Sequence, residues 1–204
     1  MRATFRLCIA IIILFILQKV FPFITSKLLL VSSQVQTRPF TLITTIFLHS
    51  NFMHLLNNLF ALAIFGFLLE KRVGSKHLLL LFFLAGIFAN IISVFFYEAV
   101  LGASGSIFGL IGCLAVLKPL GMVFVYGMPL PLFLAVAVWA FFDIAGIFTP
   151  SNIAHLSHLS GLVIGIVYGF ALRKRFKKEK PKKSKVVIDE EKIRRWEEKY
   201  LRYT

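Results

Sequence analysis

Six stretches of mostly apolar residues alternate with shorter polar segments along the chain. Each stretch has about the twenty residues that a helix needs to cross a bilayer core, or somewhat fewer. The pattern predicts six helices, at residues 5–25, 52–69, 77–97, 104–118, 121–142 and 155–172. The first stretch follows two arginines, as a signal peptide would, but no small-residue cleavage site comes after it. We therefore expect it to remain a helix.

Composition excludes an ordinary soluble domain. Of the 204 residues, 58% are hydrophobic and 23 are phenylalanine, and the mean hydropathy is +0.85. The two cysteines, Cys8 and Cys113, both lie in apolar stretches and indicate neither a zinc motif nor a redox compartment. We expect an all-α polytopic membrane protein.

The basic residues predict how the helices are oriented. Most lysines and arginines fall in residues 173–204, and others precede the first helix or fill the turn between the second and third helices. If six helices alternate in direction, these clusters share one side, which is the cytoplasm by the positive-inside rule. Both termini are then cytoplasmic in a cell membrane, with the loop at 26–51 and the turns at 98–103 and 143–154 outside.

The chain divides into a membrane domain, residues 1–172, and a basic cytoplasmic tail, residues 173–204. Beside a hydrophobic helix, such a charge run typically touches anionic lipid, so we expect no nucleic acid partner. Ile193, Trp196 and Tyr200 fall on one face of a short amphipathic helix that would lie on lipid. A disordered anchor with no catalytic role is the alternative that we favour.

A single serine, Ser104, stands between small residues where the fourth apolar stretch begins. A hydroxyl at this place is either a helix cap or a nucleophile. In the second stretch, His54 and Asn58 are four residues apart and share a helix face. Polar groups inside a membrane are costly unless they pair or line a wet cavity. The pair is therefore either part of a functional site or an interhelical hydrogen bond.

Histidines gather near the predicted outer side, at His49, His54, His155 and His158. Metal binding is one interpretation of such a group. No carboxylate or cysteine joins these histidines in a metal-binding motif, so we predict no metal ion and no cofactor.

Small residues predict a contact between the fourth and sixth helices. Glycines spaced by four form a flat stripe that lets another backbone come close. They are Gly105 and Gly109 in the fourth helix and Gly161 and Gly165 in the sixth. Because His158 lies one turn before the second pair on the same face, the contact would bring its imidazole to the Ser104 hydroxyl.

That arrangement supplies what nucleophilic catalysis requires. A base must take the serine proton, and donors must meet the oxyanion that forms. His54 and Asn58 side chains, with the Ser104 backbone N–H, can supply these donors. Asp143 is the only carboxylate of the sequence near this loop. Either it orients His158 or the site is a Ser-His dyad, which we favour.

The chain resembles the rhomboid intramembrane serine proteases of the six-helix prokaryotic type. The resemblance covers about residues 38–169, through RPFTLITTIFLHSNFMHLLNNLF, EKRVGS, GASG and HLSGLVIG in that order. It implies a six-transmembrane-helix bundle with Ser104 as nucleophile and His158 as general base. It also implies an oxyanion hole of His54, Asn58 and the Ser104 amide. The expected substrates are transmembrane segments of membrane proteins, cut near the outer face.

Two positions depart from the family pattern. Thr37 precedes Arg38 where the family usually has tryptophan, and Phe108 stands where it often has a tyrosine on which the base stacks. A phenylalanine can stack but has no hydroxyl to donate. The alternative function is a catalytically inactive rhomboid-like protein that binds membrane proteins. Such proteins lack the serine or the histidine, and both are present here.

Overall fold

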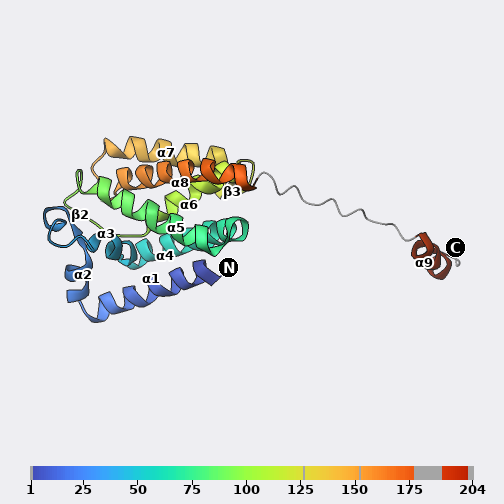
Figure 1. Cartoon of the computed structure of the whole chain (residues 1–204), viewed down its shortest axis with the longest axis horizontal. Coiled ribbons are helices and arrows are strands. Elements are labelled where there is room, and N and C mark those ends of the chain that lie inside the picture. The colour runs from blue at the N-terminus through green and yellow to red at the C-terminus, as the bar shows by residue number, and fades with distance from the viewer. Residues whose placement is uncertain (1, 126, 152, 177–189, 202–204) are drawn as a thin grey trace.

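A bundle of apolar helices forms most of the molecule (Figure 1). The computed structural model describes residues 2–125, 127–151, 153–176 and 190–201. Its α-helices are α1 (Arg2–Val20), α2 (Phe23–Leu28), α3 (Thr41–Thr44), α4 (Phe52–Ala61), α5 (Phe67–Ser93), α6 (Ser104–Leu117), α7 (Leu132–Ile147), α8 (His155–Phe176) and α9 (Glu190–Tyr200). The strands are β1 (Leu30–Val31), β2 (Ala99–Val100), β3 (Met122–Val125) and β4 (Met128–Pro131). Short 3-10 turns span Ser32–Gln34 and Thr45–Phe47, and a π-helical turn, Leu62–Gly66, joins α4 to α5.

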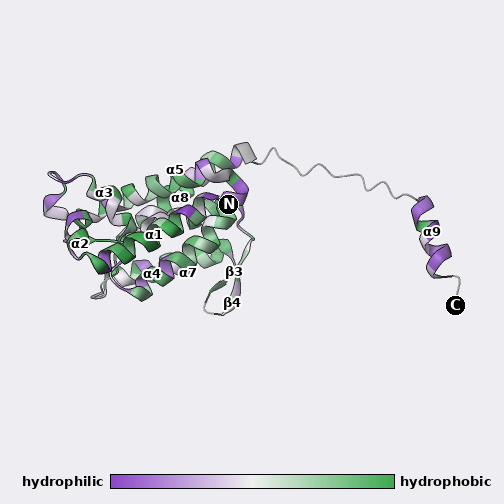
Figure 2. Cartoon of the chain, turned by 90° about the horizontal axis from the view of Figure 1, so that it is seen from below, coloured by the Kyte–Doolittle hydropathy of each residue, from purple (hydrophilic) through white to green (hydrophobic). Residues whose placement is uncertain are grey.

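The expected membrane class agrees with the length and composition of the helices. Among the described residues, three helical runs are long and apolar enough to cross a bilayer: Arg2–Val20, Phe52–Ser93 and His155–Arg173. The helices α6 and α7 are apolar but shorter. Hydrophobic residues cover most of the bundle, whereas α9 is largely hydrophilic (Figure 2). The molecule is therefore an all-α membrane bundle with two small antiparallel sheets.

One glycine separates the second and third predicted helices. Within α5, Gly74 has a φ of +83°, in the left-handed region that favours glycine. The chain is helical on both sides of this residue, from Phe52 to Val73 and from Ser75 to Ser93. The predicted turn is thus present as a sharp break.

The fifth predicted helix is wrong over residues 121–131. These residues form a hairpin in which β3 pairs with β4, and α7 begins only at Leu132. Gly127 lies in the turn with a φ of +83°, and Pro129 and Pro131 have no backbone N–H to give to a helix. Because residues 121–131 are mostly apolar, their hydropathy did not distinguish the hairpin from a helix. Similarly, the first helix ends at Val20 and not at residue 25.

A small sheet fixes the start of α6 at one end of the bundle. Strand β1 pairs with β2 in antiparallel register, with Leu30 opposite Val100. The Thr45 hydroxyl donates to the Val100 carbonyl at 2.5 Å, and the Gly102 amide donates to the Thr45 carbonyl at 3.0 Å. These bonds tie the turn before Ser104 to the long segment between α1 and α4.

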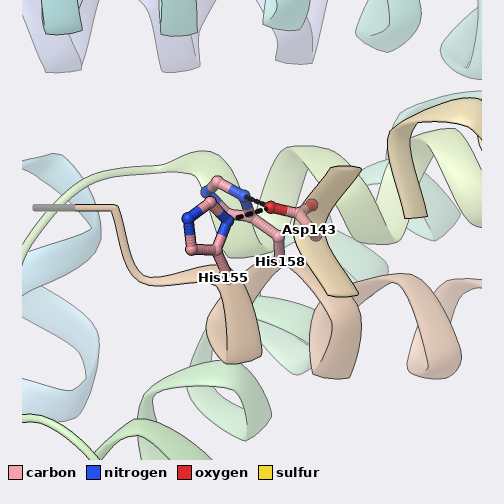
Figure 3. Close-up of side chains that lie close together, drawn as sticks. All are labelled: Asp143, His155 and His158. Atoms are coloured by element: carbon pink, nitrogen blue, oxygen red, sulfur yellow. Dashed lines mark hydrogen bonds and ion pairs between the residues drawn. The ribbon is translucent and has the colours of Figure 1, made fainter. Parts of the chain in front are cut away.

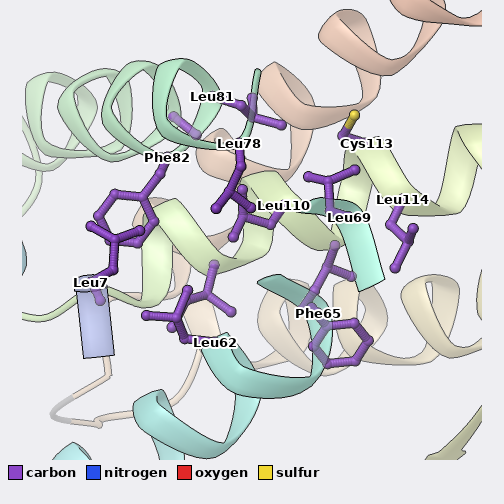
Figure 4. Packing of buried hydrophobic residues seen from close by; sticks show 14 of the residues in the cluster. Leu7, Leu62, Phe65, Leu69, Leu78, Leu81, Phe82, Leu110, Cys113 and Leu114 are labelled. Atoms are coloured by element: carbon purple, nitrogen blue, oxygen red, sulfur yellow. The ribbon is translucent and has the colours of Figure 1, made fainter. Parts of the chain in front are cut away.

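The helix α6 lies at the centre of the bundle and is buried along most of its length. Its Leu110 and Leu114 pack with Leu7 of α1, Leu69 of α5 and Leu62 of the π-helical turn (Figure 4). Large apolar side chains also cover the outside of the bundle, among them Phe5, Phe133, Phe141 and Phe170. This exposed apolar surface is suited to lipid.

Glycines let α6 and α8 come into backbone contact. A Cβ atom at Gly161 would lie 2.0 Å from the Gly105 carbonyl oxygen, and one at Gly165 would lie 1.9 Å from the Gly109 carbonyl oxygen. No side chain fits at either place, so the four glycines set the distance between the two helices. The first turn of α8 consequently lies beside the first turn of α6.

The tail contains the helix α9, on which Ile193, Trp196 and Tyr200 are all exposed. The charge run at 177–189 lies outside the described residues. The helix α8 continues to Phe176, past the domain boundary predicted at residue 172.

Candidate active site

A cavity of about 1320 Å³ opens among α4, α6 and α8, with Trp139 of α7 in its wall. The polar residues singled out in the sequence line it together: Ser104, His158, His54 and Asn58. Phe108 lines it as well. Three helices distant in sequence, α4, α6 and α8, thus bring these side chains to one hollow.

Ser104 is the first residue of α6 and comes two positions after Gly102, which has a φ of +121°. A Cβ atom on Gly102 would lie 2.8 Å from His54 Nε2, so the glycine makes room for the imidazole beside the backbone that leads to Ser104. The first amides of a helix have no intrahelical acceptor. The Ser104 N–H is therefore a donor suited to an anion in this cavity.

Hydrogen bonds at the start of α4 hold His54 and Asn58. The Asn51 side chain caps the helix by accepting from the His54 amide at 2.8 Å, and the Ser50 hydroxyl lies 3.1 Å from His54 Nδ1. Asn58 Nδ2 donates to the His54 carbonyl at 2.9 Å. If Ser50 donates to Nδ1, the proton of a neutral His54 is on Nε2, which makes that atom a donor.

His49 belongs to the support of the site. Its ring is 1% exposed and meets the His54 ring edge-on, with 5.0 Å between centroids. Burial, with a contribution from the charge of His54, lowers the pKa of His49 to about 4, so the ring is neutral at pH 7. Its backbone N–H donates to Gln18 Oε1 at 3.1 Å. This packing fixes the place of the His54 ring.

Phe108 stacks on the candidate base. The Phe108 and His158 rings lie 4.5 Å apart between centroids and only 5° from parallel. The stack restricts the rotation of the imidazole without any hydroxyl. A phenylalanine at this position therefore still fixes the plane of the ring.

A carboxylate lies against the same imidazole. Asp143 Oδ1 is 3.0 Å from His158 Nδ1 and 2.7 Å from His155 Nδ1 (Figure 3). The sequence analysis left open whether Asp143 orients His158, and it favoured a Ser-His dyad without a carboxylate. The short connection between α7 and α8 folds the two helices back on each other, which brings Asp143 to histidines 12 and 15 positions later.

The shared carboxylate determines which ring nitrogen carries the proton. As an acceptor, it pairs with an Nδ1–H on each imidazole. A neutral His158 then has its lone pair on Nε2, so this nitrogen can accept a proton. The Asp143 contact thus orients His158 and selects its tautomer.

Several supporting residues were missed in the sequence. Ser50 and Asn51 hold the start of α4, and the Asn51 cap has a recognisable signature, an asparagine three residues before an amide donor. Gly146 lies against His155, where a Cβ atom would come within 2.4 Å of the ring. Ser151 Oγ lies 3.0 Å from His155 Nε2. No local pattern indicates the Gly146 contact, because it depends on how α7 meets α8, whereas Ser151 lies only four positions before His155.

Comparisons with known proteins agree with this architecture. Residues 36–175 match the family model of the rhomboid domain. The chain is 28% identical over 171 residues to the mitochondrial Rhomboid protein 1 of Saccharomyces cerevisiae, with 77% of this chain and 49% of that protein covered. It is 32% identical over 145 residues to the chloroplastic Rhomboid-like protein 11 of Arabidopsis thaliana, covering 65% of this chain and 52% of that protein.

The chain is also similar to a bacterial rhomboid protease. The chain is 30% identical over 128 residues to the Rhomboid protease GlpG of Yersinia pseudotuberculosis, covering 61% of this chain and 45% of that protein. The chain thus spans about half the length of the relatives that it matches. Since the family model covers more than half of this chain, the chain belongs to the rhomboid family.

Proposed function

We propose that the protein is an intramembrane serine endopeptidase that cleaves transmembrane segments of membrane proteins near the outer membrane face. One observation carries the proposal: Ser104 and His158 line one cavity, together with His54 and Asn58. Relatives named as rhomboid proteases support the same activity. No metal ion or cofactor is part of the proposal.

The reaction begins with Ser104. Its Oγ attacks the scissile carbonyl while His158 Nε2 takes the hydroxyl proton. The Asp143 carboxylate holds the Nδ1–H of His158 and stabilises the imidazolium that forms. The Ser-His dyad favoured by the sequence thereby gains a positioning residue.

Donors around the cavity would stabilise the tetrahedral oxyanion. They are the Ser104 amide, the second Nδ2 hydrogen of Asn58 and the Nε2–H of His54. Collapse of the intermediate breaks the peptide bond, and His158 returns the proton to the leaving amine. Water then hydrolyses the acyl-enzyme by the same proton transfers in reverse.

The membrane topology belongs to the same proposal. Six spans are formed by α1, the two helical runs on either side of Gly74, α6, α7 and α8, with both termini in the cytoplasm. The helix α6 has 14 residues, fewer than a bilayer core requires, so Ser104 lies below the outer surface. Water reaches it through the cavity.

Cleavage by the purified full-length protein in detergent tests the function. A model protein with one transmembrane helix is expected to be cut into two fragments, and Ser104→Ala is expected to leave it whole. A fluorophosphonate probe is expected to label the parent protein at Ser104. If the protein binds the substrate without Ser104-dependent cleavage or labelling, it is the catalytically inactive rhomboid-like binder.

A further inference from the structure

The two histidines of α8, His155 and His158, form a three-residue cluster with Asp143. The proposed reaction uses Asp143 and His158 but gives His155 no role. Each of the three residues offers one ligand atom, and these atoms all lie within 4.8 Å of one another. Both histidines turn Nδ1 toward Asp143 Oδ1 (Figure 3). The sequence analysis predicted no metal site, because no carboxylate accompanies the histidines in a metal-binding motif. The structure supplies that carboxylate from α7.

We propose that Asp143, His155 and His158 form an inhibitory site for a zinc-like divalent transition-metal ion. The inhibitory part rests on the proposed protease function. Two imidazoles and one carboxylate are a ligand set that zinc commonly takes, with a fourth position left for water. Magnesium and calcium prefer oxygen ligands, so nitrogen donors select against them.

The distances in the cluster are close to those of a metal site. Tetrahedral zinc with bonds of about 2.0–2.1 Å separates its ligand atoms by roughly 3.3 Å. The two nitrogens now lie 2.7 and 3.0 Å from the carboxylate oxygen. Each nitrogen therefore has to move a few tenths of an ångström away from this oxygen to admit the ion, and all three ligand atoms already lie within 4.8 Å of one another. The three side chains are 8 to 15% exposed, so the ligands are largely desolvated yet accessible.

Neighbouring groups hold both rings in place for a metal. Phe108 stacks on His158, and Ser151 Oγ lies 3.0 Å from the far nitrogen of His155. Gly146 leaves the space that the His155 ring occupies. Such outer contacts orient metal-binding imidazoles and strengthen binding. Without an ion, the same contacts direct the two Nδ1–H groups at Asp143.

Metal binding and base catalysis exclude each other at His158. An ion on Nδ1 requires the lone pair of that nitrogen, so the single proton of the neutral ring moves to Nε2. That nitrogen can then no longer accept the Ser104 proton. The ion therefore inhibits through the tautomer of the base and does not need to cover the serine.

Zinc binding is measured by isothermal titration calorimetry on the full-length Ser104→Ala protein, with magnesium as the control ion. We expect one zinc per chain. His155→Ala and Asp143→Asn, each in the same background, should bind at least about tenfold more weakly. His77→Ala, which removes a histidine of α5, should bind like the Ser104→Ala parent. Equal affinity in all these variants, or no saturable binding, overturns the site.

Inhibition is measured as the ratio of cleavage rates with and without saturating zinc. For the wild-type protein, we expect the rate with zinc to be at least about tenfold lower than the rate without zinc. For His155→Ala, the two rates should be nearly equal, whatever activity this variant retains. Binding without inhibition overturns the tautomer argument. If the wild-type protein cleaves nothing, the proposed protease function fails, while the calorimetry still decides the metal site. Should His155→Ala not fold, Gly146→Ala displaces the same ring and takes its place.

Discussion

At the scale of single residues, the two histidines of α8 differ in what surrounds them. His158 lines the same cavity as Ser104 and stacks on Phe108, whereas His155 borders a smaller hollow with Gly146 and contacts Ser151. We expect His158→Ala to be as inactive as Ser104→Ala, several orders of magnitude below the parent. His155→Ala should keep substantial activity. Single-turnover cleavage by correctly folded variants measures both, and the reverse ranking would show that the base is misassigned.

Asp143 is expected to act through His158 alone. In Asp143→Asn, the amide can direct an N–H at Nδ1, which moves the ring proton to Nε2 and removes the lone pair that accepts from Ser104. We expect kcat to fall at least about tenfold, with KM nearly unchanged and an altered pH–rate profile. Asp143→Glu should recover part of the rate. A loss confined to KM or to thermal stability would instead indicate a merely structural carboxylate.

These residues also show how far sequence reasoning reaches. The pairs His54 and Asn58, or His158 and Gly161, have the spacing of one helix face, so their relation was predictable. The Asp143 contact depends on the crossing of α7 with α8 and on the loop between them. Spacing alone leaves such a contact undetermined, which is why the dyad and the carboxylate both remained open.

At the scale of helices, the α6–α8 contact was predicted from glycine spacing, whereas the β3–β4 hairpin was not. Glycine stripes have one physical meaning in a membrane, which is close backbone approach. An apolar run containing Gly127, Pro129 and Pro131 is compatible with a kinked helix or with a hairpin. Hydropathy does not distinguish these two, because both are apolar.

The glycine contact gives a prediction about stability. In Gly165→Ala, the added Cβ would lie 1.9 Å from the Gly109 carbonyl oxygen, so the helices must separate. We expect a loss of about 1–3 kcal/mol, as for other overpacked sites, and reduced activity, because Ser104 and His158 lie on these two helices. Unfolding in mixed micelles measures the loss. Ala171→Val, at an exposed position of α8, is the matched control, and an equal loss there would remove the special role of the stripe.

The helix α7 is expected to control the access of substrate. Trp139 packs edge-on against Phe65 of the π-helical turn, with 5.8 Å between ring centroids, and both line the cavity. A π-turn is a frequent feature of functional sites and makes a suitable hinge. We expect Trp139→Ala to raise the rate of cleavage of a transmembrane substrate, and Phe142→Ala, toward the C-terminal end of α7, to raise it as well.

Cross-linking provides the opposite perturbation. Cysteines at positions 65 and 139, joined by a bifunctional thiol reagent, should abolish cleavage of a transmembrane substrate, and reduction of a cleavable linker should restore it. The same cysteines without the reagent are the control. Full activity of the cross-linked protein would mean that substrate enters elsewhere.

At the scale of the whole molecule, charge and shape point to one orientation. The N-terminus, the β3–β4 hairpin and the end of α8 lie at one end of the bundle, while α2, α3 and β2 lie at the opposite end (Figure 1). The first end carries most of the basic side chains of the membrane domain: Arg2, Arg6, Lys71, Arg72, Lys76 and Lys118. The cavity with Ser104 lies toward the other end, where Leu29 and residues 96–101 line it.

The positive-inside rule turns this arrangement into a prediction. Single cysteines at Gln36 and Lys71, in a background in which Cys8 and Cys113 are replaced by alanine, mark the two ends. A membrane-impermeant maleimide should label position 36 in intact cells and position 71 only after permeabilisation. With Arg173, seven basic residues lie at that end and hold it in the cytoplasm, and six of them remain when Lys71 is replaced by cysteine. Retained cleavage by both proteins is the control for folding. Labelling of both positions from outside would be incompatible with the six-span topology, and reversed labelling would move the serine cavity to the cytoplasmic face.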